Sequence, residues 1–185
     1  MRTFIAIDLS VEIKNQLSHL VNFLKPPARD IKWVARENYH LTLNFLGEID
    51  DRQVDIIRTV LDEVVKRHNQ FVLTMKGAGS FPRGQSRMRV IWVGVAEESE
   101  LLSLQQDVEE SLFRKNFRRE ERPFSPHLTI GRAKVPENQE RLRKELEKYS
   151  QKEFGSMLVK EITFFQSILR PEGPEYKIIS QHNLS

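Results

Sequence analysis

Hydrophobic residues alternate with polar ones in some short segments of this chain and recur at helical spacing in others. Alternation over Thr3–Leu9 and over His40–Leu46 predicts two strands. Apolar residues three and four positions apart follow Ser10 and Asp50, two residue types that cap helices. We therefore expect one helix that begins at Val11, after Ser10, and a second that opens at Asp50.

The rest of the chain mixes the same two patterns. Further strands are expected at 31–34, 71–75, 89–95, 126–130, 157–169 and 176–179. Helices are expected over 97–117 and 136–149, and a loop over 77–88. Because no linker divides the chain and the two element types interleave, the pattern predicts an α/β or α+β layered domain.

One short pattern occurs twice. Residues 40–43 read His-Leu-Thr-Leu, and residues 127–130 read His-Leu-Thr-Ile. In a strand, side chains two positions apart share a face, so the histidine and the threonine of each copy point the same way. Their aliphatic neighbours face the core, and the same rule places Phe45 on the core face. If the halves pack about a pseudo-two-fold axis, two imidazoles and two hydroxyls meet at one point.

This set of side chains suits a phosphate diester. Two imidazoles can act as one general base and one general acid, on opposite sides of phosphorus. The two hydroxyls can donate hydrogen bonds to the anion, and Arg132 could add a guanidinium. A metal site would need a third ligand such as Glu48 or His68, and neither residue recurs with the motif. We therefore favour acid/base chemistry by His40 and His127 and expect no metal.

Composition excludes several other classes. The 185 residues include no cysteine, which excludes a disulfide framework, a cysteine nucleophile, an iron–sulfur cluster and a zinc site with thiolate ligands. The formal charge of +3 permits an anionic partner without requiring one. No apolar run approaches the roughly 18 residues of a membrane span. We expect a cytoplasmic protein that does not bind membranes.

Several segments resemble those of a known family. Asn38–Glu48 and Pro123–Arg132 surround the two motif copies, and Phe81-Pro82 followed by Arg89–Trp92 lies between them. With these segments, nearly the whole chain resembles the two-histidine phosphoesterases, and specifically the LigT-like RNA 2′,3′-cyclic phosphodiesterases. The resemblance implies an α+β fold in which residues 1–185 form one bilobal domain with pseudo-two-fold symmetry. Two antiparallel sheets would line a central cleft, with one motif per lobe and helices outside.

The same resemblance implies an activity and roles for the motif residues. The implied reaction is metal-independent hydrolysis of a terminal 2′,3′-cyclic phosphate on RNA, without a cofactor, to a 2′-phosphomonoester. His40 would be the proton donor to the leaving 3′ oxygen, and His127 the base that activates water. Thr42 and Thr129 would hold the phosphate oxygens. Members are also associated with joining tRNA fragments through a 2′-5′ linkage, so tRNA fragments are a candidate substrate.

Residues outside the motif are candidates for substrate contact. Tyr39, Arg87 and Arg132 are candidate substrate-binding residues. Arg83 and Arg87 belong to a loop before a strand, where they either contact RNA phosphates or are solvated. We interpret Trp92 as a packing residue.

Two alternatives to the RNA-end hydrolase stay open. One is a phosphodiesterase for small cyclic nucleotides or for 2′-5′ oligonucleotides. The other is a module that binds RNA ends without turnover. For the hydrolase and for both alternatives, we expect a monomer.

Overall fold

The structure is a computed structural model that describes residues 1–96, 99–135 and 138–185. Its strands are β1 (Arg2–Asp8), β2 (Ile31–Trp33), β3 (His40–Glu48), β4 (Phe71–Phe81), β5 (Val90–Val95), β6 (His127–Ala133), β7 (Glu153–Val159), β8 (Glu161–Arg170) and β9 (Gly173–Asn183). Its helices are α1 (Val11–Leu24), α2 (Asp51–Val65), α3 (Ser99–Phe113) and α4 (Glu140–Glu147), with a short 3₁₀ helix at Arg36–Asn38.

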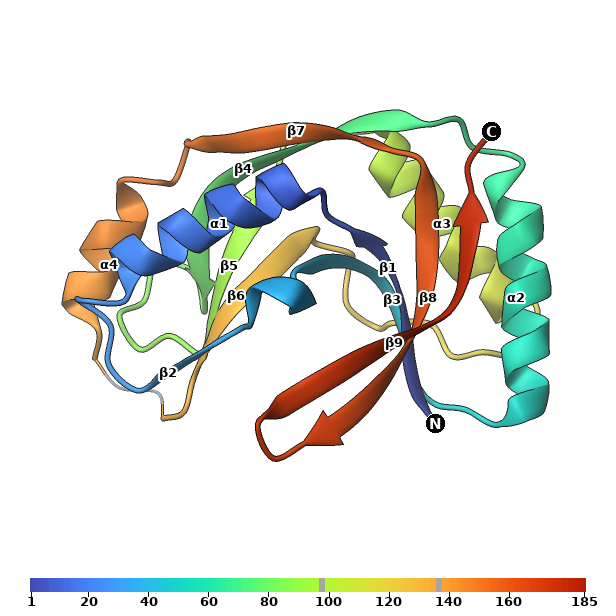
Figure 1. The fold of residues 1–185 in the computed structure, drawn as a ribbon, viewed down its shortest axis with the longest axis horizontal. Coiled ribbons are helices and arrows are strands. Elements are labelled where there is room, and N and C mark those ends of the chain that lie inside the picture. Colours follow the sequence, from blue (N-terminus) through green and yellow to red (C-terminus); the bar gives the residue numbers. More distant parts are fainter. Residues whose placement is uncertain (97–98, 136–137) are drawn as a thin grey trace.

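The strands form two sheets in which neighbouring strands are antiparallel. Sheet A has the order β3-β1-β8-β9, and sheet B has the order β2-β6-β5-β4-β7. Helices α2 and α3 pack beside sheet A, and α1 and α4 beside sheet B (Figure 1). The expectation of an α+β fold with two antiparallel sheets is confirmed. The sheets interleave along the sequence, because β2 joins sheet B and β8 and β9 return to sheet A.

The two N-terminal helices begin where the capping residues predict. The Ser10 hydroxyl accepts a hydrogen bond from the Ile13 amide at 3.3 Å. Asp50 and Gln53 form a reciprocal capping box, in which each side chain accepts from the other residue's backbone N–H at 2.8 and 3.0 Å. These bonds satisfy amides that have no partner inside the helix. The buried faces of both helices then join the main core.

The strands that carry the repeated motif bury their aliphatic faces as expected. Leu41 on β3 and Leu128 on β6 are 0% and 1% exposed. Both strands then contain an irregularity at the same motif position. In the register of the β1–β3 pair, Leu43 is left without a partner, and in that of the β5–β6 pair, Ile130 is left without one. Each is the fourth residue of its motif, and both strands show the same burial pattern around it.

This irregularity reverses the alternation that follows it and corrects one expectation. Phe45 does not face the core: its side chain is 52% exposed. It lies directly opposite Phe4 across the β1–β3 pair. Side chains directly opposite one another share a face of the sheet. Because the Phe4 ring contacts His40, Phe45 lies on the histidine face. A bulge inserts one extra residue, so a count of alternate positions fails beyond it.

Several expected boundaries also change. The expected loop over 77–88 is wrong in its first part, because β4 continues to Phe81 past a register shift and Gly77, which has φ +77°. The expected strand over 157–169 is two strands separated at Lys160, one in each sheet. The expected helix starts at Glu97 and Pro136 lie outside the described residues. Among the residues that are described, no helix combines the length and apolar character that a membrane span requires.

Replacing Leu128 by alanine should destabilise the protein strongly. Its side chain lies in the main core behind the motif, so truncation removes buried surface and leaves a cavity. We expect a loss of about 2–5 kcal/mol in the free energy of unfolding, measured by urea denaturation. Leu102 is 42% exposed on α3 and serves as the control, with an expected change within about 0.5 kcal/mol. Equal losses for the two variants would contradict this placement of the motif strand.

Candidate active site

The first motif histidine is held by a backbone carbonyl. His40 opens β3, and its Nδ1 lies 2.8 Å from the carbonyl oxygen of Asn38. Because a carbonyl oxygen only accepts, Nδ1 carries the proton in the neutral ring. The unprotonated Nε2 then accepts from the Thr42 hydroxyl at 3.1 Å. This contact confirms that the histidine and the threonine of the first motif share a face.

The second motif histidine repeats this arrangement. Nδ1 of His127 lies 2.7 Å from the carbonyl oxygen of Ser125, which is again two residues earlier. The same reasoning places the proton on Nδ1 and leaves Nε2 as the atom that can accept or donate. Thr129 follows two positions later on β6, as Thr42 does on β3. Each motif therefore fixes its imidazole tautomer through the backbone rather than through a carboxylate.

Aromatic rings surround His40, and sequence reasoning missed their role. The Phe4 ring lies 4.7 Å from the imidazole, and Tyr176 meets it edge-on at 5.1 Å. Burial in this environment lowers the pKa of His40, and the hydrogen bond to Asn38 acts in the opposite direction. In the free protein, this favours the neutral ring. No sequence signal places Tyr176 here, because it arrives on β9 from a distant part of the chain.

His127 has a different neighbour. Phe81, at the end of β4, meets the His127 ring edge-on at 5.1 Å. Phe81 also contacts Trp92 on β5, with ring centroids 5.4 Å apart. Among the residues that the structure describes, Phe81 lies beside the second histidine, whereas Phe4, Phe165 and Tyr176 lie around the first.

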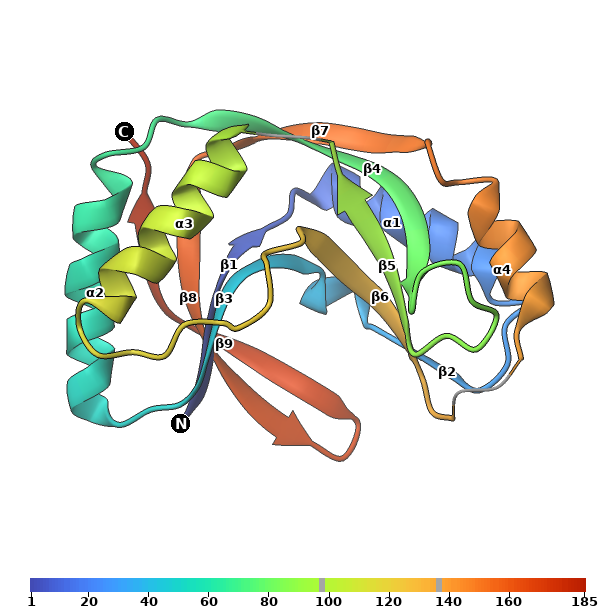
Figure 2. The same cartoon turned by 180° about the vertical axis from the view of Figure 1, so that it is seen from behind.

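Arg132 lies on the side of the sheet that carries the second motif. It is the fifth residue after His127, as Phe45 is the fifth after His40, and the bulge at Ile130 turns it onto the same face. Its charge also reaches the other sheet. Burial raises the pKa of Tyr176, and the positive charges of Arg132 and Arg2 act in the opposite direction. Tyr176 contacts His40, so the charge of Arg132 also acts close to His40. In this region, β3 of sheet A and β6 of sheet B approach each other (Figure 2).

The other two candidate contact residues lie elsewhere. Tyr39 is 2% exposed and packs in the main core, so its proposed contact with substrate is not supported. Tyr39 directly precedes β3, where strand alternation does not yet fix the direction of a side chain. Its place in the sequence therefore does not reveal that it is buried. Arg87 is exposed in the β4–β5 connection, where its backbone pairs with Asn138. Within the described ranges, no recorded contact joins Arg87 to either motif histidine.

The alternative metal ligands are engaged in other pairs. Glu48 lies 3.2 Å from the N-terminal amine, and His68 lies 2.9 Å from Asp107. In the part of the chain that the structure describes, no group of three or more histidine, aspartate or glutamate side chains is arranged to hold a metal ion.

Comparison with known proteins gives the family. Residues 10–168 match the 2′-5′ RNA ligase superfamily. The chain is 39% identical over 179 residues to an RNA 2′,3′-cyclic phosphodiesterase of Archaeoglobus fulgidus, with 96% of this chain and 97% of the relative covered. A protein of the same description from Methanocaldococcus jannaschii is 35% identical over 181 residues, with 98% and 99% covered.

Solved structures agree with the sequence matches. Protein TT0787 of Thermus thermophilus superposes with a TM-score of 0.84 at 25% identity, covering 100% of this chain and 98% of the other. LigT of Escherichia coli in complex with 3′-AMP superposes with a TM-score of 0.80 at 28% identity, over 100% and 98% of the two chains. Both the sequence and the fold therefore show that this chain belongs to the 2′-5′ RNA ligase superfamily.

Proposed function

We propose that this protein is an RNA 2′,3′-cyclic phosphodiesterase that hydrolyses a terminal cyclic phosphate to a 2′-phosphomonoester. One observation supports the proposal: two histidines with the same backbone-fixed tautomer, one from each sheet, are each followed two positions later on the same strand by a threonine. Curated relatives at 35% and 39% identity carry this description over nearly their whole length.

The proposed reaction moves two protons at two nitrogens. Nε2 of His127 removes a proton from water as the water oxygen attacks phosphorus. The bond from phosphorus to the 3′ oxygen breaks, and Nε2 of His40, protonated at the start, delivers its proton to that oxygen. The ester to the 2′ oxygen survives, which gives the 2′-phosphomonoester. Since the imidazoles supply both proton transfers, the steps require no metal.

Other side chains stabilise the charge on phosphorus. The Thr42 hydroxyl, which donates to His40 in the free protein, would turn to a phosphate oxygen in the complex, and Thr129 would do the same in the other motif. Arg132 would add a positive charge on the side of His127. The bound anion in turn favours the protonated form of His40, against the effect of burial.

We further propose that the substrates are RNA ends, including tRNA fragments, and that a cytoplasmic monomer acts on them. The four motif residues are contributed by strands β3 and β6 of one chain. A single copy therefore carries the whole proposed constellation.

Replacing either motif histidine by alanine should abolish most turnover. With a short RNA ending in a 2′,3′-cyclic phosphate and EDTA present, we expect His40→Ala and His127→Ala each to lower kcat by about 10²–10⁴-fold. The double variant should lose far less than the product of the two, because the residues act as a unit. Chromatography that separates 2′- from 3′-phosphate products measures the rate and the bond broken.

The control for this experiment is His19→Ala, since His19 is exposed on α1 and outside both motifs. It should retain the wild-type rate. Near-full activity of His40→Ala, a 3′-phosphate product or loss of turnover in EDTA would each contradict the proposed reaction.

The rate should depend on pH through both imidazoles. We expect bell-shaped profiles for kcat/KM and for kcat. Burial lowers the pKa of His40 in the free protein, whereas the phosphate of bound substrate favours its imidazolium form. The basic limb, which His40 sets as the acid, should therefore lie at higher pH in the kcat profile than in the kcat/KM profile. A flat profile would contradict the proposed acid/base pair, and a basic limb at the same pH in both profiles would contradict the proposed effect of the phosphate on His40.

A further inference from the structure

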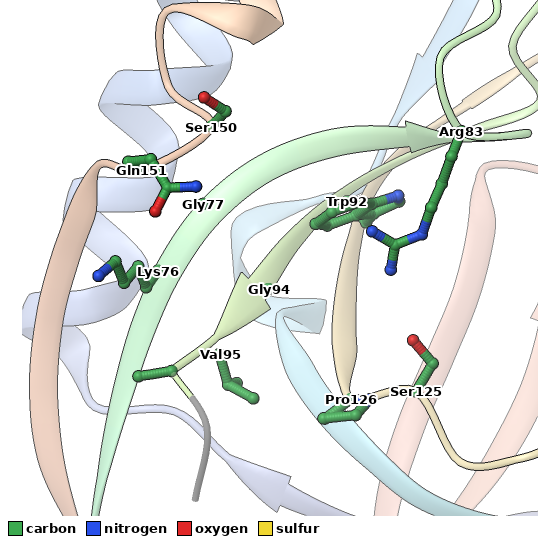
Figure 3. A pocket seen from close by; sticks show the side chains of 11 residues that line it. Lys76, Gly77, Arg83, Trp92, Gly94, Val95, Ser125, Pro126, Ser150 and Gln151 are labelled. Atoms are coloured by element: carbon green, nitrogen blue, oxygen red, sulfur yellow. The ribbon is translucent and has the colours of Figure 1, made fainter.

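A pocket of about 420 Å³ lies beside the second motif (Figure 3). Its lining includes Ser125 and Pro126, the two residues before His127. Lys76, Arg83 and Trp92 line it from β4, from the β4–β5 connection and from β5. The volume lies within the range of about 300–1,000 Å³ typical of small-molecule sites. None of the steps proposed above uses this pocket.

The indole of Trp92 lies on the same face of sheet B as the second motif. Trp92 is directly opposite Thr129 across the β5–β6 pair, and residues so paired point to the same face. In the pseudo-equivalent position of sheet A, Ala6 lies opposite Thr42. Opposite the motif threonine, sheet B therefore carries a tryptophan where sheet A carries an alanine.

Two glycines allow the indole to lie against the sheet. A Cβ atom added to Gly79 on β4 would lie 2.6 Å from Cζ2 of Trp92, and one added to Gly94 on β5 would lie 3.3 Å from Cζ3. Any side chain at Gly79 would displace the ring, and one at Gly94 would crowd it. The six-membered ring thus lies close to the backbone at two glycines, and Trp92 also lines the pocket.

A guanidinium completes this surface. The Arg83 guanidinium carbon lies 5.0 Å from the Trp92 ring centre and 5.4 Å from that of Phe81. Figure 3 shows the Arg83 side chain extending down beside the indole, toward Ser125. Phe81 contacts both His127 and Trp92. A continuous row of ring contacts therefore runs from the second motif histidine to the pocket.

We propose that this pocket, formed by Trp92 and Arg83, binds the nucleobase of the nucleoside that carries the 5′ oxygen of a 2′-5′ phosphodiester. Unpaired bases stack on aromatic rings and on arginine planes, and both are present here. The proposal rests on the function proposed above, in which His127 serves the entering oxygen. A nucleoside whose 5′ hydroxyl takes the place of water therefore lies on the Trp92 side of phosphorus.

Cleavage of such a diester reverses that step. His40 removes the proton from the adjacent 3′ hydroxyl, whose oxygen bonds to phosphorus to form the 2′,3′-cyclic phosphate. The bond from phosphorus to the 5′ oxygen breaks, and His127 delivers a proton to the departing 5′ oxygen. Trp92 and Arg83 are binding residues in this reaction, because they hold the departing nucleoside and transfer no proton.

Two substrates separate the roles of the two nucleosides. Adenosine 2′,3′-cyclic phosphate carries one base, and the 2′-5′-linked dinucleotide of adenosine carries two. For Trp92→Ala we expect kcat/KM on the dinucleotide to fall on the order of tenfold to a hundredfold, while hydrolysis of the cyclic nucleotide stays within about twofold of wild type. Trp92→Phe should keep most of the dinucleotide activity. Phe23→Ala removes an aromatic ring that is 65% exposed on α1 and should match wild type on both substrates.

Each other outcome overturns the proposal in a distinct way. Equal losses on both substrates would place the terminal nucleoside on Trp92, and no loss on either would leave Trp92 a packing residue. A wild-type protein that hydrolyses the cyclic nucleotide but not the dinucleotide would refute this inference and leave the proposed function standing. A wild-type protein that hydrolyses neither the cyclic nucleotide nor an RNA cyclic phosphate end would refute the proposed function itself.

A binding measurement does not depend on turnover or on the folding of Trp92→Ala. The chain has two tryptophans, so Trp92 is the one tryptophan left in Trp33→Phe, and excitation at the red edge of its absorption avoids the tyrosines. In that background, with His127→Ala to prevent cleavage, the dinucleotide should quench tryptophan fluorescence, and adding Arg83→Ala should weaken its binding. Absence of quenching at saturating dinucleotide would overturn the proposal.

Discussion

A hydrogen bond from Nδ1 to the carbonyl oxygen two residues earlier determines what each motif histidine can do. It places the proton of the neutral ring on Nδ1, so that Nε2 faces the reaction as an acceptor, or as a donor when the ring is charged. The bond forms within one short segment, so it needs no partner from elsewhere in the fold. Both sheets can therefore present an equivalent imidazole, which is what a displacement with groups on opposite sides of phosphorus requires.

The surroundings then make the two imidazoles different. Phe4 and Tyr176 enclose His40, and the loss of solvent lowers its pKa. His127 contacts Phe81, and next to it lies the pocket of Trp92. The two motifs thus share a tautomer and a strand position but differ in the residues packed around them. In the proposed reaction, this difference separates the side of the leaving 3′ oxygen from the side of the entering oxygen.

Much of this arrangement could be predicted from the sequence, because alternation within a strand is a local property. The repeat placed His40 with Thr42 and buried Leu41 correctly. The prediction failed for Phe45, because the bulge before it has no residue signature: Asn44 follows it in one strand and Gly131 in the other. The order of the strands in each sheet could not be predicted either, because local sequence patterns do not specify which strands pair.

The glycine-rich end of β4 is a second place where local sequence did not predict the structure. Its glycines suggest a loop when read alone, and they support an indole once β5 lies beside them. Trp92 packs against these glycines, as the interpretation from the sequence expects, and it also lines the pocket beside the second motif. Local sequence does not reveal this contact, because Gly79 lies on the neighbouring strand.

Convergence of both imidazoles on one phosphate is the central claim, and histidine-selective NMR during a titration with inorganic phosphate tests it directly. His40→Ala and His127→Ala assign the two Nε2 resonances. The account predicts that both resonances shift together, with one common Kd, because one anion contacts both rings. Movement of a single resonance, or two distinct Kd values, would show that the histidines do not share a phosphate and would contradict the account.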